Sequence, residues 1–167
     1  MRMPKPARFV DDYLSYLLGR AGHAVYVDFH RSVRAAGFSA LEWRVLAQLA
    51  GSPGLTIGEL ARQVIAQQPT VTKLVQRMEK SGWVERTSDP GDARRTLVTE
   101  TRKGREVVGG LLRAAKRHEA QILDPHSAGD VRALKKILRA LVARYENDRT
   151  ATVDAPAAER PAKTSKH

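Results

Sequence analysis

Residues 56–105 of the chain read TIGELARQVIAQQPTVTKLVQRMEKSGWVERTSDPGDARRTLVTETRKGR, and the signals for helices and strands in this segment are the clearest in the sequence. Residues 56–59 form a Thr-x-x-Glu capping box that opens a helix of about two turns. After a brief break, Pro69 suits the first turn of a second helix, because its missing N–H costs nothing there. Two short helices joined by a tight turn predict a helix-turn-helix.

A β-hairpin is predicted directly after the second helix. Residues 83–87 are a β-prone run, residues 88–92 have strong turn chemistry, and residues 96–99 are the return strand. Arg94 and Arg95 give the hairpin a basic tip. A helix-turn-helix followed by such a hairpin is a winged helix, in which the hairpin is the wing.

Long amphipathic helices are predicted on both sides of the winged helix. Apolar residues recur every three or four positions over 9–36, over 101–123 and from about Ser127 onward. Ser39-Ala40-Leu41-Glu42 is a second capping box, opening a helix toward Leu49. The outer helices have more apolar surface than a winged helix can cover, so a symmetric homodimer is expected.

The expected fold class is therefore mainly α with a small β-hairpin wing: a winged helix-turn-helix with long flanking dimerisation helices. We expect one domain over residues 9–147, with dimerisation helices at 9–36 and 101–147 and the winged helix-turn-helix at about 39–100. Residues 1–8 are expected to be a flexible N-terminus. Residues 148–167 are polar and rich in Ala, Pro and Lys, which predicts a disordered basic tail.

The composition narrows the possible functions. The 167 residues contain 29 Lys and Arg against 18 Asp and Glu, a net charge of +11, and a domain this basic usually meets phosphate. Ten basic and five acidic residues lie from Arg62 to Arg105, so much of the excess positive charge is concentrated on the predicted winged helix-turn-helix and the residues that directly follow it. The absence of cysteine excludes disulfides, thiolate metal sites and cysteine nucleophiles. No run approaches the roughly 18 apolar residues of a membrane helix, so a cytoplasmic protein without membrane contact is expected.

The second helix of the helix-turn-helix is expected to read DNA. Val71, Leu74, Val75 and Met78 form its buried stripe and leave the other face for the major groove. Glutamine suits adenine, threonine can contact a thymine methyl, and lysine or arginine suits phosphate or guanine. The expected DNA-binding residues of this element are Gln67, Gln68, Pro69, Thr70, Thr72, Lys73, Gln76 and Arg77.

The wing offers a different contact. Arg94 at the hairpin tip can enter the minor groove, where negative potential is concentrated, and Arg95 adds a second cation. Asp92 can pin either the hairpin or the arginine through a charged hydrogen bond. The alternative is that Asp92 and Arg94 form only an exposed pair that contributes under about 1 kcal/mol.

These motifs resemble the MarR family of winged-helix transcription regulators over about residues 10–147. The strongest similarity is the run Pro69–Arg86, followed by Asp-x-Arg at 92–94 and Thr-x-x-Gly at 101–104; residues 41–46 also look like the family's second helix. The family often has glycine where Ile65 stands, and usually serine at the position of Gln67 and leucine at that of Glu100. A slightly different turn, a weaker N-cap and altered packing at the wing base are therefore expected.

The resemblance implies a sequence-specific regulator of double-stranded DNA with a pseudo-palindromic operator, a repressor rather than an activator. It also implies a small aromatic carboxylate or phenolic effector, bound between the first helices and the dimer interface. Aromatic and cationic side chains in that region suit an anion that carries a ring. The candidate ligand-binding residues are Tyr13, Tyr16, Arg20, His23, Tyr26, Trp43 and Arg44.

Two other classes of function are alternatives to this one. A nonspecific architectural DNA-binding protein would explain the charge and the helix-turn-helix, but not the wing signature or the long outer helices. An enzyme is not expected, because the chain lacks the phosphate-loop, nucleophile-elbow and zinc-protease motifs. No cofactor is expected. No metal site is expected either, since His23 and His30 lie about 10 Å apart along one helix, which is too far to share a metal ion without another segment.

Overall fold

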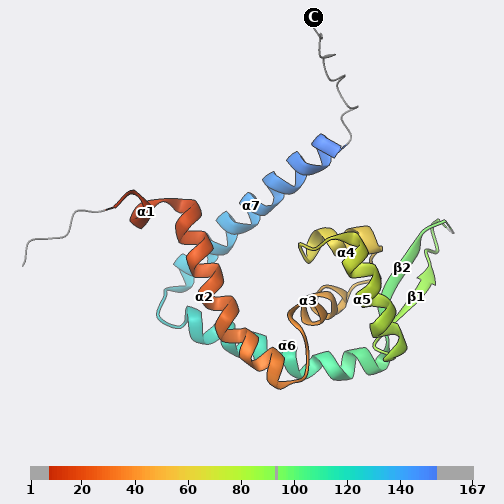
Figure 1. Ribbon diagram of the computed structural model, residues 1–167. Helices are drawn as coiled ribbons and strands as arrows, with labels where there is room; N and C mark the ends of the chain where they lie inside the picture. Colours follow the sequence, from red (N-terminus) through yellow and green to blue (C-terminus); the bar gives the residue numbers. More distant parts are fainter. Residues whose placement is uncertain (1–7, 93, 154–167) are drawn as a thin grey trace, which may run out of the picture. The chain divides into compact units, whose positions relative to one another are not determined.

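Residues 8–92 and 94–153 are described in this computed structural model, and they contain seven helices and two strands (Figure 1). In chain order these elements are α1 (Phe9–Asp12), α2 (Leu14–Ala35), α3 (Ala40–Leu49), α4 (Ile57–Gln63), α5 (Gln68–Lys80), β1 (Val84–Ser88), β2 (Thr96–Glu100), α6 (Arg102–Leu123) and α7 (Ala128–Val153). The chain divides after Glu119 into two compact units. The predicted fold class, mainly helical with a hairpin wing, is confirmed.

Reciprocal capping fixes where the central helices begin. The Ser39 hydroxyl accepts the Glu42 N–H at 3.2 Å, and the Glu42 carboxylate accepts the Ser39 N–H at 2.8 Å. Thr56 and Glu59 make the same pair of bonds at the start of α4. Both predicted capping boxes are confirmed, and each satisfies two backbone donors that a helix start would leave unpaired.

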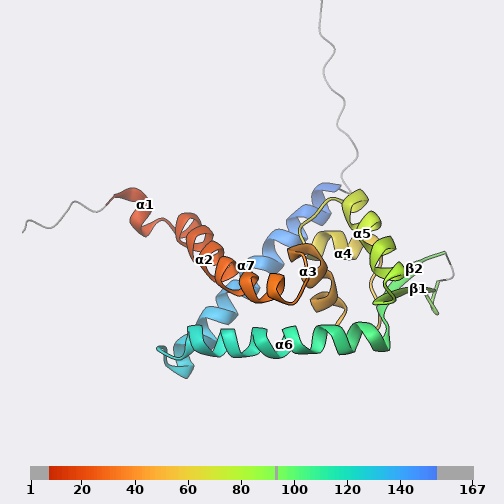
Figure 2. The ribbon, with the colours of Figure 1, turned by 60° about the horizontal axis from the view of Figure 1, so that its bottom comes forward.

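A hydrophobic core holds α5 in place. The predicted stripe of Val71, Leu74, Val75 and Met78 is buried, with each side chain no more than 1% exposed. Leu46 and Leu49 of α3, Leu60 of α4, and one valine from each strand complete the centre of this core. Figure 2 shows α3, α4 and α5 gathered beside the hairpin, with α6 leaving its base. The opposite face of α5 is thereby directed outward.

The wing is a two-stranded antiparallel hairpin attached to the segment before α4. Its register pairs Val84 with Glu100 at the base and Ser88 with Thr96 toward the tip. Leu55 adds a short third segment: its N–H donates to the Val98 carbonyl at 3.0 Å, and the Val98 N–H donates back at 2.8 Å. The helix-turn-helix and the base of the wing are therefore joined by backbone hydrogen bonds.

The prediction of one helix over 9–36 is wrong at Tyr13. This residue has an extended backbone (φ −81°, ψ 116°), which separates α1 from α2. In α1 the Asp11 carboxylate is turned back onto the Arg8 N–H at 3.2 Å and the Arg8 guanidinium at 2.8 Å. That contact closes a four-residue turn with no buried residue, so no packing forces the turn to continue into α2. The predicted end at Gly37 is confirmed by its φ of +84°.

The last helix is longer than expected. Helix α7 runs to Val153, so its final turns occupy positions assigned to the tail that starts at 148. No glycine or proline occurs between positions 130 and 155 to stop it. Residues 1–7 and 154–167, where the flexible N-terminus and the rest of the basic tail were predicted, lie outside the described residues.

The turn between α4 and α5 has an unusual backbone. Ile65 lies in the left-handed region, with φ of +53°, and its side chain is 79% exposed. Its N–H donates to the Arg62 carbonyl at 3.2 Å, and the next N–H, of Ala66, donates to the Ala61 carbonyl at 3.0 Å. The turn therefore has the conformation that glycine favours, although a β-branched residue occupies the position.

Candidate nucleic-acid interface

The outward face of α5 is polar and basic. Thr70, Lys73, Gln76, Arg77 and Lys80 line a shallow depression of about 460 Å³. In the part of the chain that the structure describes, Lys73, Arg77 and Lys80 have no carboxylate partner. Lys80 was not among the expected contacts, although its spacing from Lys73 and Arg77 puts it on the same helix face. Three cations on one face are thus without acidic partners among the described residues.

The predicted base-reading residues lie at the start of α5. Gln67, Gln68, Pro69 and Thr70 are exposed. Gln67 is the N-cap residue and makes no side-chain capping bond, which confirms the expected weak cap. Thr72 is half-buried, and its hydroxyl donates to the Gln68 carbonyl at 2.9 Å. The hydroxyl proton of Thr72 is therefore used in a hydrogen bond within the helix. The two glutamines and Thr70 are the freest hydrogen-bonding groups at this end.

Arg86 on β1, unlike the three cations of α5, is paired with a carboxylate. Its guanidinium contacts the Glu79 carboxylate at 2.7 Å, and this pairing lowers the pKa of Glu79 and raises the pKa of Arg86. Both groups lie near the surface, so the pair contributes little to stability. Arg86 is thus neutralised by a neighbour, unlike the three cations of α5.

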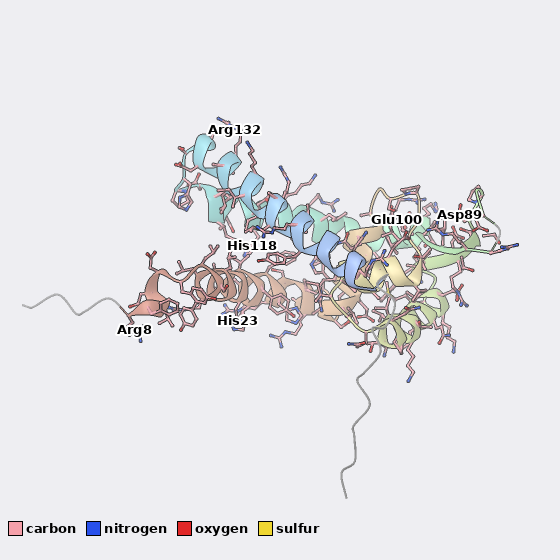
Figure 3. All side chains as sticks on the ribbon, turned by 90° about the horizontal axis from the view of Figure 1, so that it is seen from above. Arg8, His23, Asp89, Glu100, His118 and Arg132 are labelled. Carbon is pink, nitrogen blue, oxygen red and sulfur yellow. The ribbon has the colours of Figure 1, made fainter. Side chains whose placement is uncertain are left out.

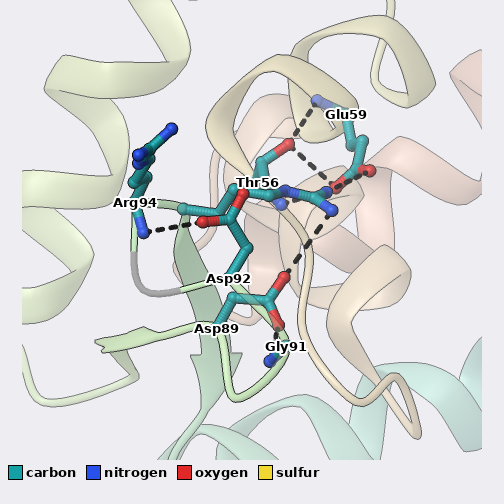
Figure 4. A network of polar contacts seen from close by, with 7 residues as sticks. Thr56, Glu59, Asp89, Gly91, Asp92 and Arg94 are labelled. Atoms are coloured by element: carbon teal, nitrogen blue, oxygen red, sulfur yellow. Dashed lines mark hydrogen bonds and ion pairs between the residues drawn. The ribbon is translucent and has the colours of Figure 1, made fainter.

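The wing carries one unpaired cation. Asp92 accepts the Arg94 N–H at 3.0 Å, so it pins the hairpin backbone rather than the arginine side chain (Figure 4). The Arg94 side chain is exposed, and its guanidinium makes no ion pair with any described residue. Arg95 differs: its guanidinium contacts Glu59 at 3.2 Å and Asp89 at 3.6 Å. Of the two predicted wing cations, only Arg94 is free.

The wing base is joined tightly to the start of α6. The Thr101 hydroxyl donates to the Gly82 carbonyl at 2.7 Å and accepts the Gly104 N–H at 3.0 Å. The Thr101 N–H donates to the Trp83 carbonyl at 3.1 Å. A Cβ at Gly104 would overlap that same carbonyl oxygen, so only glycine fits here. The Thr-x-x-Gly motif therefore has a structural cause.

Glu100 shows how the chain accommodates a carboxylate at the wing base. One carboxylate oxygen accepts the Gly51 N–H at 3.3 Å, whereas the other is buried without a hydrogen-bond partner among the described residues. Figure 3 places Glu100 at the inner end of the hairpin and Asp89 toward its outer end. The altered packing expected here takes the form of a bond from strand β2 to the turn after α3.

The seven predicted ligand-binding residues are spread over separate contacts. Their individual contacts are Tyr13 stacked on Phe9, Arg20 over the Tyr16 ring at 5.8 Å, Tyr26 stacked on His30, Trp43 tilted against Phe29, and Arg44 donating to the Val64 carbonyl at 2.8 Å. His23 is exposed on α2 (Figure 3). Of the seven, these contacts bring only Tyr16 and Arg20 together; Tyr13, Tyr26, Trp43 and Arg44 contact other residues.

A histidine contact between α2 and α6 escaped the sequence reasoning. His118 Nε2 lies 3.1 Å from Asp28 Oδ2, and the His118 ring tilts against Phe29 (Figure 3). Phe29 in turn contacts Trp43. His118 lies 90 positions from Asp28 in sequence, so no local spacing could reveal the pair.

An apolar cavity of about 570 Å³ lies beside this region. It is lined by Ser32, Ala36, Phe38, Trp83, Val107, Gly110, Leu111 and Ala114. None of the seven predicted ligand-binding residues lines it. Phe38 and Trp83 form a tilted ring pair, with 5.2 Å between centroids, that joins the end of α2 to the start of the wing.

Residues 8–92 and 94–153 contain neither a metal-binding cluster nor a membrane-spanning helix. There, no three His, Asp or Glu side chains gather closely enough to hold a metal ion. None of the helices in these ranges has the length and apolar character needed to cross a membrane.

A helix-turn-helix with an unpaired basic face, followed by a wing with a free arginine, defines a winged-helix protein of the nucleic-acid-binding class. Residues 36–95 match the MarR family. The MarR family transcriptional regulator SPO1453 from Silicibacter pomeroyi is similar in structure, with a TM-score of 0.72, 33% identity, and coverage of 83% of this chain and 99% of that one. The chain belongs to the MarR family of transcriptional regulators.

Two curated relatives extend the comparison. The transcriptional activatory protein BadR of Rhodopseudomonas palustris is 34% identical over 105 residues, which are 60% of this chain and 60% of BadR. The homoprotocatechuate degradative operon repressor of Escherichia coli is 25% identical over 132 residues, 79% of this chain and 89% of the repressor. The similar proteins thus include both an activator and a repressor by name.

Proposed function

We propose that the protein is a homodimeric, sequence-specific regulator of double-stranded DNA that acts as a repressor in the cytoplasm. One observation carries this proposal: Lys73, Arg77 and Lys80 on α5 and Arg94 on the wing lack acidic partners among the described residues and lie on exposed faces. Four such cations per protomer supply the sequence-independent attraction to phosphate. No catalytic role is assigned.

Base recognition is proposed for the start of α5. In a helix-turn-helix the first residues of the second helix contact base edges in the major groove. Gln68 and Thr70 are exposed there, and a glutamine amide can make two hydrogen bonds to the major-groove edge of adenine. Arg94 is proposed to enter the adjacent minor groove. Sequence is thus read by α5, while the wing adds affinity.

Dimerisation is proposed through the outer helices. Apolar side chains remain exposed along the first part of the chain, namely Phe9, Tyr13, Leu14, Leu17, Leu18, Val25 and Val27. On α7, Leu134, Ile137, Val142 and Tyr145 are exposed as well. Large apolar side chains exposed in such numbers along a helix typically mark an interface. A two-fold dimer would place two α5 helices on half-sites about 10 base pairs apart.

The function is tested by competition on a selected DNA site. We expect the protein to enrich one pseudo-palindromic sequence from a random duplex pool and to protect both half-sites in footprinting. It should stay bound to that duplex in the presence of about a thousandfold excess of unrelated DNA. The affinity for a specific site is typically higher than that for nonspecific DNA by at least about this factor. Loss of the duplex to unrelated DNA would favour the architectural protein instead.

We further propose that a small aromatic acid is the effector. The named operon of the Escherichia coli relative concerns an aromatic acid, homoprotocatechuate. In this chain Arg20 lies over the Tyr16 ring at 5.8 Å, a cation beside an aromatic wall. Such a pair suits a ring with a carboxylate. An effector that favours the released state weakens DNA binding, and DNA weakens effector binding by the same factor.

The effector proposal predicts a linked pair of responses. Benzoate, hydroxybenzoates or nicotinate should raise the melting temperature and release the selected duplex, whereas cationic or uncharged analogues should not. For Arg20→Ala, the effector concentration that gives half of each response should rise at least about tenfold, because the substitution removes a charge-assisted contact. Arg31→Ala, an exposed arginine on the same helix, is the matched control. Arg44→Ala is unsuitable, since Arg44 holds the Val64 carbonyl. Release by uncharged analogues alone would contradict the proposal.

A further inference from the structure

Arg95 lies at the centre of a contact that joins the wing to the first helix of the helix-turn-helix. Its Nη2 lies 3.2 Å from Glu59 Oε1 on α4, and its Nη1 lies 3.6 Å from Asp89 Oδ2 in the hairpin turn (Figure 4). Glu59 and Arg95 are 36 positions apart in sequence. One guanidinium thus links the wing turn to α4, in addition to the Leu55–Val98 backbone bonds that join the wing base to the segment before α4.

Each carboxylate around Arg95 is held by a second bond. The other oxygen of Glu59 accepts the Thr56 N–H and the Thr56 hydroxyl, both at 2.8 Å. The other oxygen of Asp89 accepts the Gly91 N–H at 2.9 Å. These bonds hold the two carboxylates in position independently of Arg95. The pKa of Glu59 is lowered mainly by the hydrogen bonds from Thr56 and less by the charge of Arg95.

The backbone of Arg95 closes the same turn. The Asp89 N–H donates to the Arg95 carbonyl, and the Arg95 N–H donates to the Asp92 carbonyl, both at 2.9 Å. Asp92 also accepts the N–H of Arg94 through its side chain. The conformation that presents Arg94 is therefore built on the residues that Arg95 ties to α4.

Charge also argues against direct DNA contact by Arg95. Glu59, Asp89 and Arg95 together carry a net charge of −1, so the two neighbouring carboxylates weaken the attraction between the Arg95 guanidinium and a phosphate. Arg94 has no such neighbours. The adjacent arginines are therefore in opposite electrostatic environments.

We infer that Arg95 is a positioning residue that ties the wing to α4, so that α5 and Arg94 engage DNA in one fixed relative arrangement. The inference rests on the proposed DNA-binding function and refines it: Arg94 contacts DNA, and Arg95 acts through Arg94. The contact between Arg95 and Glu59 is named here the wing clamp.

The wing clamp is tested with Glu59→Gln, which separates positioning from charge. Glutamine serves in a capping box as well as glutamate, so α4 keeps its start. Its amide, however, gives Arg95 no carboxylate. The substitution raises the net charge by one, and electrostatics alone would tighten DNA binding. The wing clamp predicts the opposite, about tenfold weaker binding to the selected duplex, within the range of couplings between neighbouring residues.

A mutant cycle measured by fluorescence anisotropy completes the test. Arg95→Gln should weaken binding about as much as Glu59→Gln, and the double variant no more than either one. Arg94→Ala should weaken wild-type binding and flatten its salt dependence, yet have little further effect in the Glu59→Gln background. Glu85→Gln is the matched control, because it removes an exposed carboxylate from the wing strand and should bind at least as tightly as wild type.

The possible results distinguish a failure of the wing clamp from a failure of the proposed DNA-binding function. If the wild type enriches no duplex, the proposed function fails. If it binds but Glu59→Gln binds equally well or more tightly, or if Arg95→Gln has its full effect in the Glu59→Gln background, Arg95 contacts DNA directly and the wing clamp is wrong. Should Glu59→Gln melt early, Arg95→Gln tests the same contact from the wing side, because it leaves the Thr56–Glu59 capping box intact; unchanged binding by this variant would also overturn the inference.

Discussion

Replacement of Gly104 by alanine is expected to lower the free energy of unfolding by about 3 kcal/mol or more. The added methyl group would overlap the Trp83 carbonyl oxygen, which belongs to the backbone and cannot swing away. That carbonyl also accepts the Thr101 N–H, so a shift would break the junction between the wing base and α6. Overpacking at such a site exceeds the usual cost of 1–3 kcal/mol because no rotamer relieves it.

Thermal and urea unfolding followed by circular dichroism measure this effect. Gly110→Ala is the matched control on the same helix, since its Cβ would meet no atom within 4 Å. Alanine in an open helix interior should stabilise by about 0.5–1 kcal/mol. The two variants should therefore shift in opposite directions. A Gly104→Ala protein that unfolds together with wild type would show that α6 is not tightly joined to Trp83.

Two glutamates on α2 are expected to dissociate the proposed dimer. Leu18 and Val25 lie on one side of α2 by helical period, and both are exposed in the single chain. Leu18→Glu/Val25→Glu would bring four unpaired carboxylates into a symmetric apolar interface, a large desolvation cost. The mass by light scattering should fall from about twice 18.5 kDa to 18.5 kDa. Affinity for the two-half-site duplex should fall at least about 100-fold, because linked binding is lost.

The control for this variant places glutamates on the other side of the same helix. His23 and Arg34 are exposed and lie opposite Leu18 and Val25 by helical period. His23→Glu/Arg34→Glu should leave the mass at that of a dimer, and circular dichroism should show that both variants stay helical. A dimeric mass for Leu18→Glu/Val25→Glu would mean that these α2 residues are not in the interface.

Local signals in the sequence were sufficient for the winged helix. Capping boxes at Ser39 and Thr56 and the buried stripe of α5 depend on contacts three or four residues apart, which spacing reveals. The turn residues at 88–92 likewise predicted the hairpin, whose strands differ from expectation by one residue. These elements follow rules that act within a few residues of the chain.

Long-range side-chain contacts were beyond the same reasoning. Arg94 and Arg95 are identical in sequence terms, yet one is free and the other meets Glu59 across 36 positions. Arg44, considered as a ligand residue, instead donates to Val64 across 20 positions. Spacing cannot show which carboxylate or carbonyl lies opposite a given arginine in the fold. The break at Tyr13 was missed because apolar periodicity continues through it, although nothing is buried in α1.

Ile65 makes the turn of the helix-turn-helix unusually tolerant of a change in residue identity. A left-handed backbone costs a non-glycine residue about 1–2 kcal/mol. Glycine would remove that strain but would add about 0.5–1 kcal/mol of unfolded-state entropy to be lost on folding. The isoleucine side chain is 79% exposed, so its loss removes little packing. These effects nearly offset one another, so sequence drift at this position can exchange glycine for a branched residue while the protein continues to present the same helix to its target.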